Sequence, residues 1–348
     1  MWRGGVALGT AVLLALTGCA VRAEPIAASS AEPEGVLTAA PDEDPASATR
    51  CLVRRSFPPS AARPGTVAAR TLIAGVDLSD PTMSHWNAAT RQFEGFNIDL
   101  LLAVAQRLWP GADPRKKITF RAVQPGTEAL ARLDLSPEDP GYVDVVATSI
   151  TATCEQAARV LFSNDYLDSG QTALVRRAPG IGTINDRPQY AGMDELGGHR
   201  VCAGAGTTSL TNVQRYRTRT GQRLIAVQAE HPIDCLVLLR QGAVDAVSTD
   251  ENVLRGFTLM APDTTLVTEP PQRQSCKFNQ QKPCTWFTDE PHAFAFGRGN
   301  RELTGYVNYV LETMRDSGVW ARAHERWLGQ HPDLGMPVPE APVQEWPW

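Results

Sequence analysis

Short apolar runs alternate with amphipathic segments along much of this chain. The run from Thr71 to Asp77 is apolar and ends at a carboxylate, which predicts a buried strand. The segment that begins at Asn97 predicts a helix, because apolar residues recur at helical spacing: Ile98, Leu101, Leu102, Ala105 and Leu108. Trp109-Pro110-Gly111 ends that helix. A strand, a helix and a further strand in alternation predict a parallel α/β sheet.

The chain repeats this pattern once. Val143-Asp144-Val145-Val146-Ala147-Thr148 matches Val244-Asp245-Ala246-Val247-Ser248-Thr249, and Ile73-Ala74-Gly75 is echoed by Cys202-Ala203-Gly204. Two matches in the same order indicate two similar lobes. Ligands bind beyond the carboxyl ends of the strands in open parallel sheets. The small polar residues that end both repeated strands therefore predict a cleft between two such edges.

The two ends of the chain differ from this body. Arg3 precedes an apolar run from Val6 to Leu16, and this layout over residues 1–19 is that of an export signal. Leu16-Thr17-Gly18-Cys19 resembles the bacterial lipoprotein motif, in which the cysteine is lipidated; a plain signal peptide with a chance cysteine is the alternative. Residues 20–65 lack the apolar content to order themselves and predict a disordered tether. Residues 331–348 form a Pro- and Trp-containing tail.

Charge and cysteine content narrow the function. The formal charge of −5 and the lack of a basic run argue against nucleic-acid binding, and no Walker pattern suggests a nucleotide or another cofactor. The cysteines show no Cys-x-x-Cys spacing, so no metal site is expected. Removing Cys19 from the seven cysteines leaves six, an even number that indicates disulfides in an exported protein. Their pairing stays open from spacing alone.

Five motifs occur in a telling order. They are Gly95-Phe96-Asn97-Ile98-Asp99-Leu100, Ser149-Ile150-Thr151 through Phe162-Ser163, Gly206-Thr207-Thr208-Ser209, Val244-Asp245-Ala246-Val247 and Arg315-Asp316-Ser317-Gly318. Together they resemble the polar-amino-acid solute-binding proteins of ABC importers, in particular the glutamine/glutamate-binding lipoproteins of actinobacteria.

The resemblance implies a two-lobed, periplasmic-binding-protein-like α/β fold with the ligand held between the lobes. Lobe 1 would comprise residues 66–172 and 292–330, and lobe 2 residues 173–291. The chain would cross between the lobes near Gly170–Val175 and Pro291–Phe296.

The resemblance also assigns ligand positions. Asp250 would bind an α-ammonium group, although a helix N-cap is an equally good local explanation, and Asp77 is a weaker candidate of the same kind. Gly206, Thr207 and Thr208 would form an anion site at a helix N-terminus. Ser149 and Thr151 would hold the α-carboxylate. The family's aromatic sandwich corresponds to the loop that contains Met83 and Trp86.

Position 156 departs from the family. Relatives carry an arginine there that grips the α-carboxylate, whereas this chain carries Gln156. Thr153 and Gln156 fit a capping box, so Gln156 could simply complete the helix. Three alternatives stay open: Arg159 reaches back to the site, Gln156 holds a neutral or amide-bearing solute, or α-amino-acid binding has been lost.

We predict three disulfides, Cys51–Cys154, Cys202–Cys235 and Cys276–Cys284. We expect a monomeric, lipid-anchored receptor on the outer face of the cell membrane. It would capture a small polar solute, such as glutamate or glutamine, for an ABC permease without catalysing a reaction. A sensor that signals to a membrane partner is the first alternative. A dehydratase-like enzyme is the second, with Glu251 as its candidate acid–base residue.

Overall fold

Most of the body is described by the computed structural model, namely residues 1, 58–68, 70–177, 190, 192–267 and 286–329. Four cysteines lie outside these residues: Cys19, Cys51, Cys276 and Cys284. The predicted tail 331–348 and residues 2–57 of the predicted leader and tether also lie outside them. Within the described part of the chain, no helix combines the length and hydropathy needed to cross a bilayer.

The first sheet has five strands in the order β5-β1-β6-β14-β7. Strand β1 is parallel to both β5 and β6, whereas β14 runs antiparallel to β6 and β7. The strands are β1 (Leu72–Val76), β5 (Ile118–Ala122), β6 (Val145–Thr151), β7 (Leu161–Phe162) and β14 (His292–Phe296). The apolar residues of its main core cluster come from these strands and from α3 (Phe96–Leu108), α9 (Arg301–Asp316) and α10 (Val319–His324). We call this assembly lobe 1.

The second sheet follows the order β10-β9-β11-β8-β12, with β13 also paired to β8. Strand β9 is parallel to β10 and β11, and β8 is antiparallel to its neighbours. The strands are β8 (Gly170–Arg176), β9 (Arg200–Gly204), β10 (Ile225–Ala229), β11 (Ala246–Asp250), β12 (Thr264–Leu266) and β13 (Thr288–Asp289). Its helices are α6 (Thr208–Arg215), α7 (Pro232–Arg240) and α8 (Glu251–Met260). We call this assembly lobe 2.

Shorter elements complete both lobes. A three-stranded antiparallel sheet on lobe 1 consists of β2 (Ser79–Asp80), β3 (Ser84–Asn87) and β4 (Gln92–Glu94). The short helices are α2 (Gly65–Ala68), α4 (Thr127–Ala131) and α5 (Cys154–Ala157). Single 3₁₀ turns occur at Pro114–Lys116, Arg132–Asp134 and Met193–Leu196, and a π-helical turn follows α10 at Glu325–Gly329.

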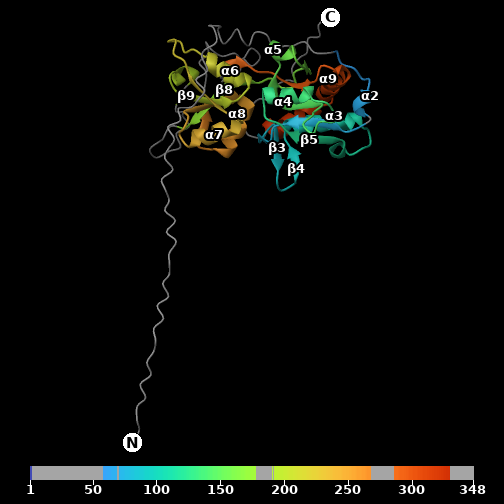
Figure 1. Cartoon of the computed structure of the whole chain (residues 1–348), viewed down its shortest axis with the longest axis horizontal. Coiled ribbons are helices and arrows are strands. Elements are labelled where there is room, and N and C mark those ends of the chain that lie inside the picture. Colours follow the sequence, from blue (N-terminus) through green and yellow to red (C-terminus); the bar gives the residue numbers. More distant parts are fainter. Residues whose placement is uncertain (2–57, 69, 178–189, 191, 268–285, 330–348) are drawn as a thin grey trace. The chain divides into compact units, whose positions relative to one another are not determined.

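The chain crosses between the lobes twice. It leaves lobe 1 after β7 and enters lobe 2 at β8, then returns between β13 and β14. The crossings therefore occupy residues 163–169 and 290–291, just before the two strands expected to carry them. The boundary placed at residue 172 falls inside β8. Figure 1 shows the consequence, because the red α9 lies with the blue α2 and the blue-green α3. The predicted two-lobed α/β fold is confirmed.

The repeated Val-Asp motif has a structural cause. In lobe 1 the Asp144 carboxylate accepts a hydrogen bond from Ile73 N at 2.9 Å, and Asp144 N donates to Ile73 O at 2.8 Å. In lobe 2 Asp245 makes the same pair of bonds with Arg200, at 2.9 and 2.8 Å. Each aspartate thus joins its strand to the start of the neighbouring strand. The echo marks equivalent sheet joints and not a binding site.

The folded body begins earlier than expected. Ser60 N donates to Gly305 O on α9 at 3.0 Å, the Arg63 guanidinium donates to Leu108 O, and Pro64 is buried. Residues 58–65, which the composition assigned to the tether, therefore pack on lobe 1. Low apolar content misled the prediction, because this segment is held mainly by backbone hydrogen bonds to existing helices.

A disulfide links Cys202 on β9 to Cys235 on α7, with the two Cα atoms 5.5 Å apart. Both residues are fully buried in lobe 2, and this predicted pair is confirmed. Cys154 is also disulfide-bonded, and its partner lies outside the described residues. The predicted pairs Cys51–Cys154 and Cys276–Cys284 both include residues outside the described range and stay predictions.

Candidate functional site

A cleft lies where the strand ends of the two lobes meet. Its empty space, including the open mouth, is about 580 Å³. The carboxyl ends of β6 and β11, and the residues that follow β1 and β9, supply much of its lining. Seven of the predicted ligand residues line it: Asp77, Ser149, Thr151, Gln156, Thr207, Thr208 and Asp250. The rule that parallel sheets bind ligands at their carboxyl edges therefore located the cleft correctly.

Ser149 turns the end of β6 toward this cleft. Its φ of 56° lies in the left-handed region, which non-glycine residues seldom adopt. Such conformations persist only where surrounding structure enforces them, and here the flanking residues Thr148 and Ile150 are buried in the sheet. Thr148 and Ile150 line the cleft as well, although the sequence did not single them out.

Asp250 ends β11 and stands at the N-cap position of α8. Its side chain makes no capping hydrogen bond. Instead, Oδ2 lies 3.2 Å from His292 Nε2 on β14 of lobe 1, while Oδ1 has no hydrogen-bond partner among the described residues. The side chain is only 6% exposed. The alternative explanation of Asp250 as a helix cap is therefore wrong, and one buried carboxylate oxygen stays available at the cleft.

Gln156 does not complete a capping box either. Thr153 Oγ1 accepts a hydrogen bond from Gln156 N at 3.3 Å, which is one half of the box. The reciprocal half is missing, since the buried Gln156 Oε1 atom has no partner among the described residues. Gln156 lines the cleft with that oxygen unpaired. The residue thus belongs to the site and not only to the helix.

The loop after β9 serves mainly as a scaffold. Thr207 Oγ1 donates to Gly204 O at 2.7 Å and accepts from Leu210 N at 3.2 Å, so this hydroxyl caps α6. Gly206 does not line the cleft. Its carbonyl accepts a 3.2 Å hydrogen bond from Thr127 N of lobe 1. Gly206 therefore joins the lobes at the edge of the cleft.

Two aspartates of lobe 1 face the cleft beside one another in sequence. Asp77 accepts hydrogen bonds from Ser79 N and Oγ, and burial raises its pKa. Asp80 Oδ1 accepts from Thr82 N, Thr82 Oγ1 and Met83 N, each at 3.0 Å. Burial raises the pKa of Asp80 to about 7. Sequence reasoning missed Asp80, although an aspartate three residues after a strand-end aspartate was the available signal.

A buried polar network joins the lobes behind the cleft, and Glu290 is its centre. Thr151 Oγ1 of lobe 1 donates to Glu290 Oε2 at 2.6 Å, and Asn212 Nδ2 of lobe 2 donates to Oε1 at 2.7 Å. Thr288 Oγ1 donates to the same Oε1 at 2.9 Å. Burial, and then the charge of Asp250, raise the pKa of Glu290 to about 7. Sequence reasoning missed Glu290, which sits directly before the predicted crossing strand.

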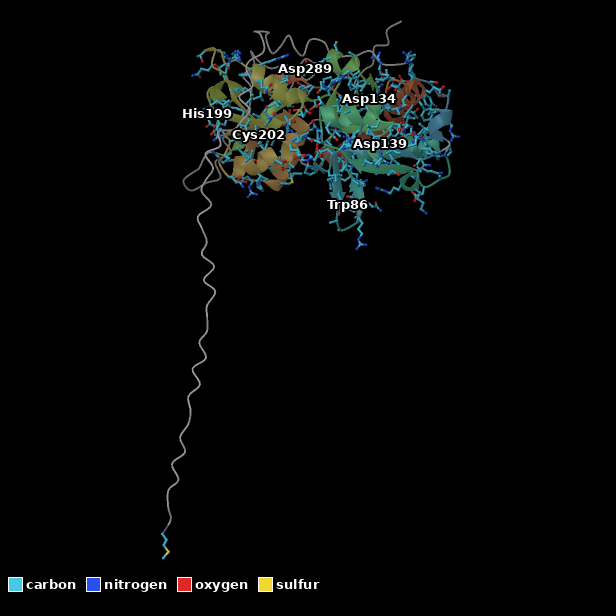
Figure 2. All side chains as sticks on the ribbon, in the orientation of Figure 1. Trp86, Asp134, Asp139, His199, Cys202 and Asp289 are labelled. Carbon is cyan, nitrogen blue, oxygen red and sulfur yellow. A yellow bond between two sulfur atoms is a disulfide. The ribbon has the colours of Figure 1, made fainter. Side chains whose placement is uncertain are left out.

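Three predicted ligand residues lie elsewhere. Met83 is fully buried in the lobe 1 core, and Trp86 is 46% exposed and packs edge-on against Phe93 at 5.0 Å. Figure 2 shows Trp86 on the hairpin of β3 and β4, which projects from lobe 1. Of residues 83–86, only Ser84 lines the cleft.

Arg159 is exposed and does not line the cleft. Helix α5 ends at Ala157, so the helical spacing that would bring Arg159 beside Gln156 is not maintained.

Residues 72–330 match the family of bacterial extracellular solute-binding proteins, family 3. The ABC transporter glutamine-binding protein GlnH of Bacillus subtilis is 24% identical over 262 residues, which cover 75% of this chain and 82% of the relative. The glutamate-binding protein GluB of Corynebacterium glutamicum is 26% identical over 194 residues, which cover 55% of this chain and 57% of the relative.

Solved structures agree on the fold. An ancestral arginine-binding protein bound to glutamine is 25% identical, with a TM-score of 0.58 over 74% of this chain and 98% of that one. An ancestral amino acid-binding protein, a precursor of cyclohexadienyl dehydratase, is 24% identical, with a TM-score of 0.57 over 74% and 96% of the two chains. The predicted family resemblance is confirmed.

Proposed function

The chain belongs to the bacterial extracellular solute-binding proteins of family 3, and from this premise we propose that its cleft captures one small polar solute for an ABC permease. The solute would bind between the lobes and be released at the membrane. Relatives named for glutamine, glutamate and cystine support an amino acid or a related compound. Lipid anchoring through Cys19 and a monomeric state are part of the proposal.

One observation carries this function. The Asp250 side chain is buried, lines the cleft and leaves Oδ1 without a hydrogen-bond partner among the described residues. An unpaired buried oxygen of this kind costs free energy unless a donor completes it. A solute amine is such a donor, and it would be held next to Thr151 and Thr208.

A receptor without catalysis is favoured over an enzyme. Glu251, the candidate acid–base residue, is not a lining residue of the cleft. Its carboxylate accepts hydrogen bonds from Arg255 Nε at 2.6 Å and from Trp286 Nε1. A carboxylate bound to an arginine four residues later on the same helix is suited to a structural role. Incubation of the protein with a bound solute, followed by product analysis, tests this part of the proposal.

A thermal-shift screen tests the capture function. The panel contains amino acids, small amines and organic acids. A ligand present at 100 times its dissociation constant stabilises the folded protein by about 2.7 kcal/mol, which is a clear rise in melting temperature. We expect at least one class of compound to produce this rise. If no compound of any class shifts the melting temperature, the capture function is wrong.

A further inference from the structure

The lining of the cleft has one sign of charge. Asp77, Asp80 and Asp250 contribute carboxyl groups from both lobes. None of the lining residues that the structure describes is a lysine, an arginine or a histidine. Behind this surface lies a fourth carboxyl group, that of Glu290, which is bonded to the lining residue Thr151. Electrostatic interactions are strong in such a poorly solvated space, so the cleft favours a cation over an anion.

The unpaired polar atoms of the lining point to the same chemistry. Four buried oxygens of lining residues have no hydrogen-bond partner among the described residues: Ser84 Oγ, Thr148 Oγ1, Gln156 Oε1 and Asp250 Oδ1. Two of these can only accept hydrogen bonds, and the two hydroxyls can accept as well as donate. Buried polar atoms are nearly always paired in folded proteins. A ligand that brings several N–H donors would satisfy all four atoms.

The basic groups near the cleft are occupied or face away. Arg255, on α8 just after Asp250, is hydrogen-bonded to Glu251 at 2.6 Å. His292 contacts Asp250 itself, and Arg159 is exposed outside the lining. No described side chain is therefore placed to grip a carboxylate of the solute from within the cleft.

Resting on the capture function proposed above, we propose that the solute is a small organic cation that needs no α-carboxylate. Its ammonium or guanidinium group binds Asp250 Oδ1, and further N–H groups donate to Gln156 Oε1 and the hydroxyls of Ser84 and Thr148. Compounds of this class include diamines and guanidino-amines. An acidic solute such as glutamate would place its negative charge among the three aspartates, which like-charge repulsion disfavours.

The α6 N-terminus is the one feature that favours a solute carboxylate. Its first N–H groups face the lobe boundary, and a helix N-terminus attracts anions. Thr207 already accepts the Leu210 N–H, which satisfies one of these donors. A carboxylate held there would show as tighter binding of an amino acid than of its decarboxylated counterpart.

Matched pairs of ligands separate these outcomes in calorimetric titrations of the folded protein. Arginine is compared with agmatine and lysine with cadaverine, because each pair differs only in the α-carboxylate. Glutamine and glutamate complete the panel. We expect agmatine or cadaverine to bind at least as tightly as its amino-acid partner, and glutamate to bind at least 100-fold more weakly. An amino acid that binds tenfold more tightly than its amine would overturn the inference, and so would tightest binding of glutamine or glutamate. Either result would leave the capture function intact, whereas binding by no compound would end both.

A variant supplies the second test. Gln156→Arg introduces a positive charge and donors where the lining offers an acceptor. We expect it to weaken the binding of the amine by at least tenfold. Gln92→Arg adds the same charge at an exposed position of β4 and is the control. Equal affinity of the two variants for the amine would overturn the inference, and circular dichroism would confirm that both are folded.

Discussion

His292 Nε2 on a strand of lobe 1 lies 3.2 Å from Asp250 Oδ2 at the end of the middle strand of lobe 2. One carboxylate oxygen is thus held across the lobe boundary, and the other stays unpaired at the cleft. The contact fixes the orientation of Asp250 before any solute arrives. A fixed acceptor loses little conformational entropy on binding, which favours affinity.

Asp250→Asn should weaken solute binding by about 10- to 100-fold, because a hydrogen bond to a charged group contributes about 1.5–3 kcal/mol. Titration calorimetry with the compound identified by thermal shift measures the change. Asp263→Asn, at an exposed position between α8 and β12, removes the same charge away from the cleft. Equal loss of affinity in the two variants would show that net charge alone, and not the Asp250 contact, matters.

Glu290→Gln should change how stability depends on pH. In the folded protein the pKa of Glu290 is raised from 4.5 to about 7, so the folded state holds its proton more tightly than the unfolded state. This group therefore contributes stability below about pH 4.5 that is lost as the pH rises toward 7, by at most about 1.4 kcal/mol per pH unit. The glutamine variant resembles the protonated side chain and should lack this fall. Urea denaturation between pH 5 and 8 measures the free energy of unfolding of both proteins.

The difference between the two proteins isolates Glu290 from other titrating groups. Asp80 has its pKa raised in the same direction, whereas burial lowers the pKa of His324 to about 4 and gives the opposite slope below its usual pKa of 6.5. Both groups are present in wild type and variant. Glu302→Gln, at an exposed position of α9, should run parallel to wild type. Parallel curves for Glu290→Gln as well would rule out a buried carboxyl group with a raised pKa.

Replacing Cys202 and Cys235 together by alanine should lower the free energy of unfolding by roughly 3–4 kcal/mol. The bond closes a loop with a sequence separation of 33, and most of its effect arises from restricting the unfolded chain. Neither cysteine lines the cleft, so solute affinity should change little in conditions where the variant is folded. Chemical denaturation measures the first effect and calorimetry the second. A loss below 1 kcal/mol would contradict the loop-closure argument.

The repeated strand pattern predicted the two sheets and the edge at which they meet. This succeeded because strand ends are local features, so Ser149, Thr151 and Asp250 could be assigned from sequence. Glu290 and His292 escaped prediction because their role depends on where β14 enters the lobe 1 sheet, between β6 and β7. Sequence patterns do not specify such a non-local antiparallel insertion.

The error at Arg159 has a local cause. A residue three positions after Gln156 lies on the same helix face only while the helix continues, and α5 ends at Ala157. The error at Met83 and Trp86 has a different origin. The β2–β3–β4 sheet turns Met83 into the core and Trp86 outward, because alternate residues of a strand face opposite sides.

Gly126→Ala should weaken solute binding by holding the lobes apart. Gly126 has a φ of +91°, and an added Cβ atom would lie 2.6 Å from Gly206 O, the carbonyl that accepts the hydrogen bond of Thr127 across the lobe boundary. Because the clash is with backbone, the lobes have to separate to relieve it. We expect at least a tenfold lower affinity by calorimetry and a larger radius of gyration by X-ray scattering at saturating solute.

Gly111→Ala separates this steric effect from backbone strain. Gly111 has a similar φ of +83°, but an added Cβ atom would meet nothing within 4 Å. Both alanine variants therefore carry a left-handed penalty of roughly 1–2 kcal/mol, and only the one at Gly126 pushes against the opposite lobe. Gly111→Ala should lose stability yet bind solute as wild type does. If both variants bind equally well, the approach of residues 126 and 206 is not needed for capture, and the solute would be held without the contact seen between these two turns.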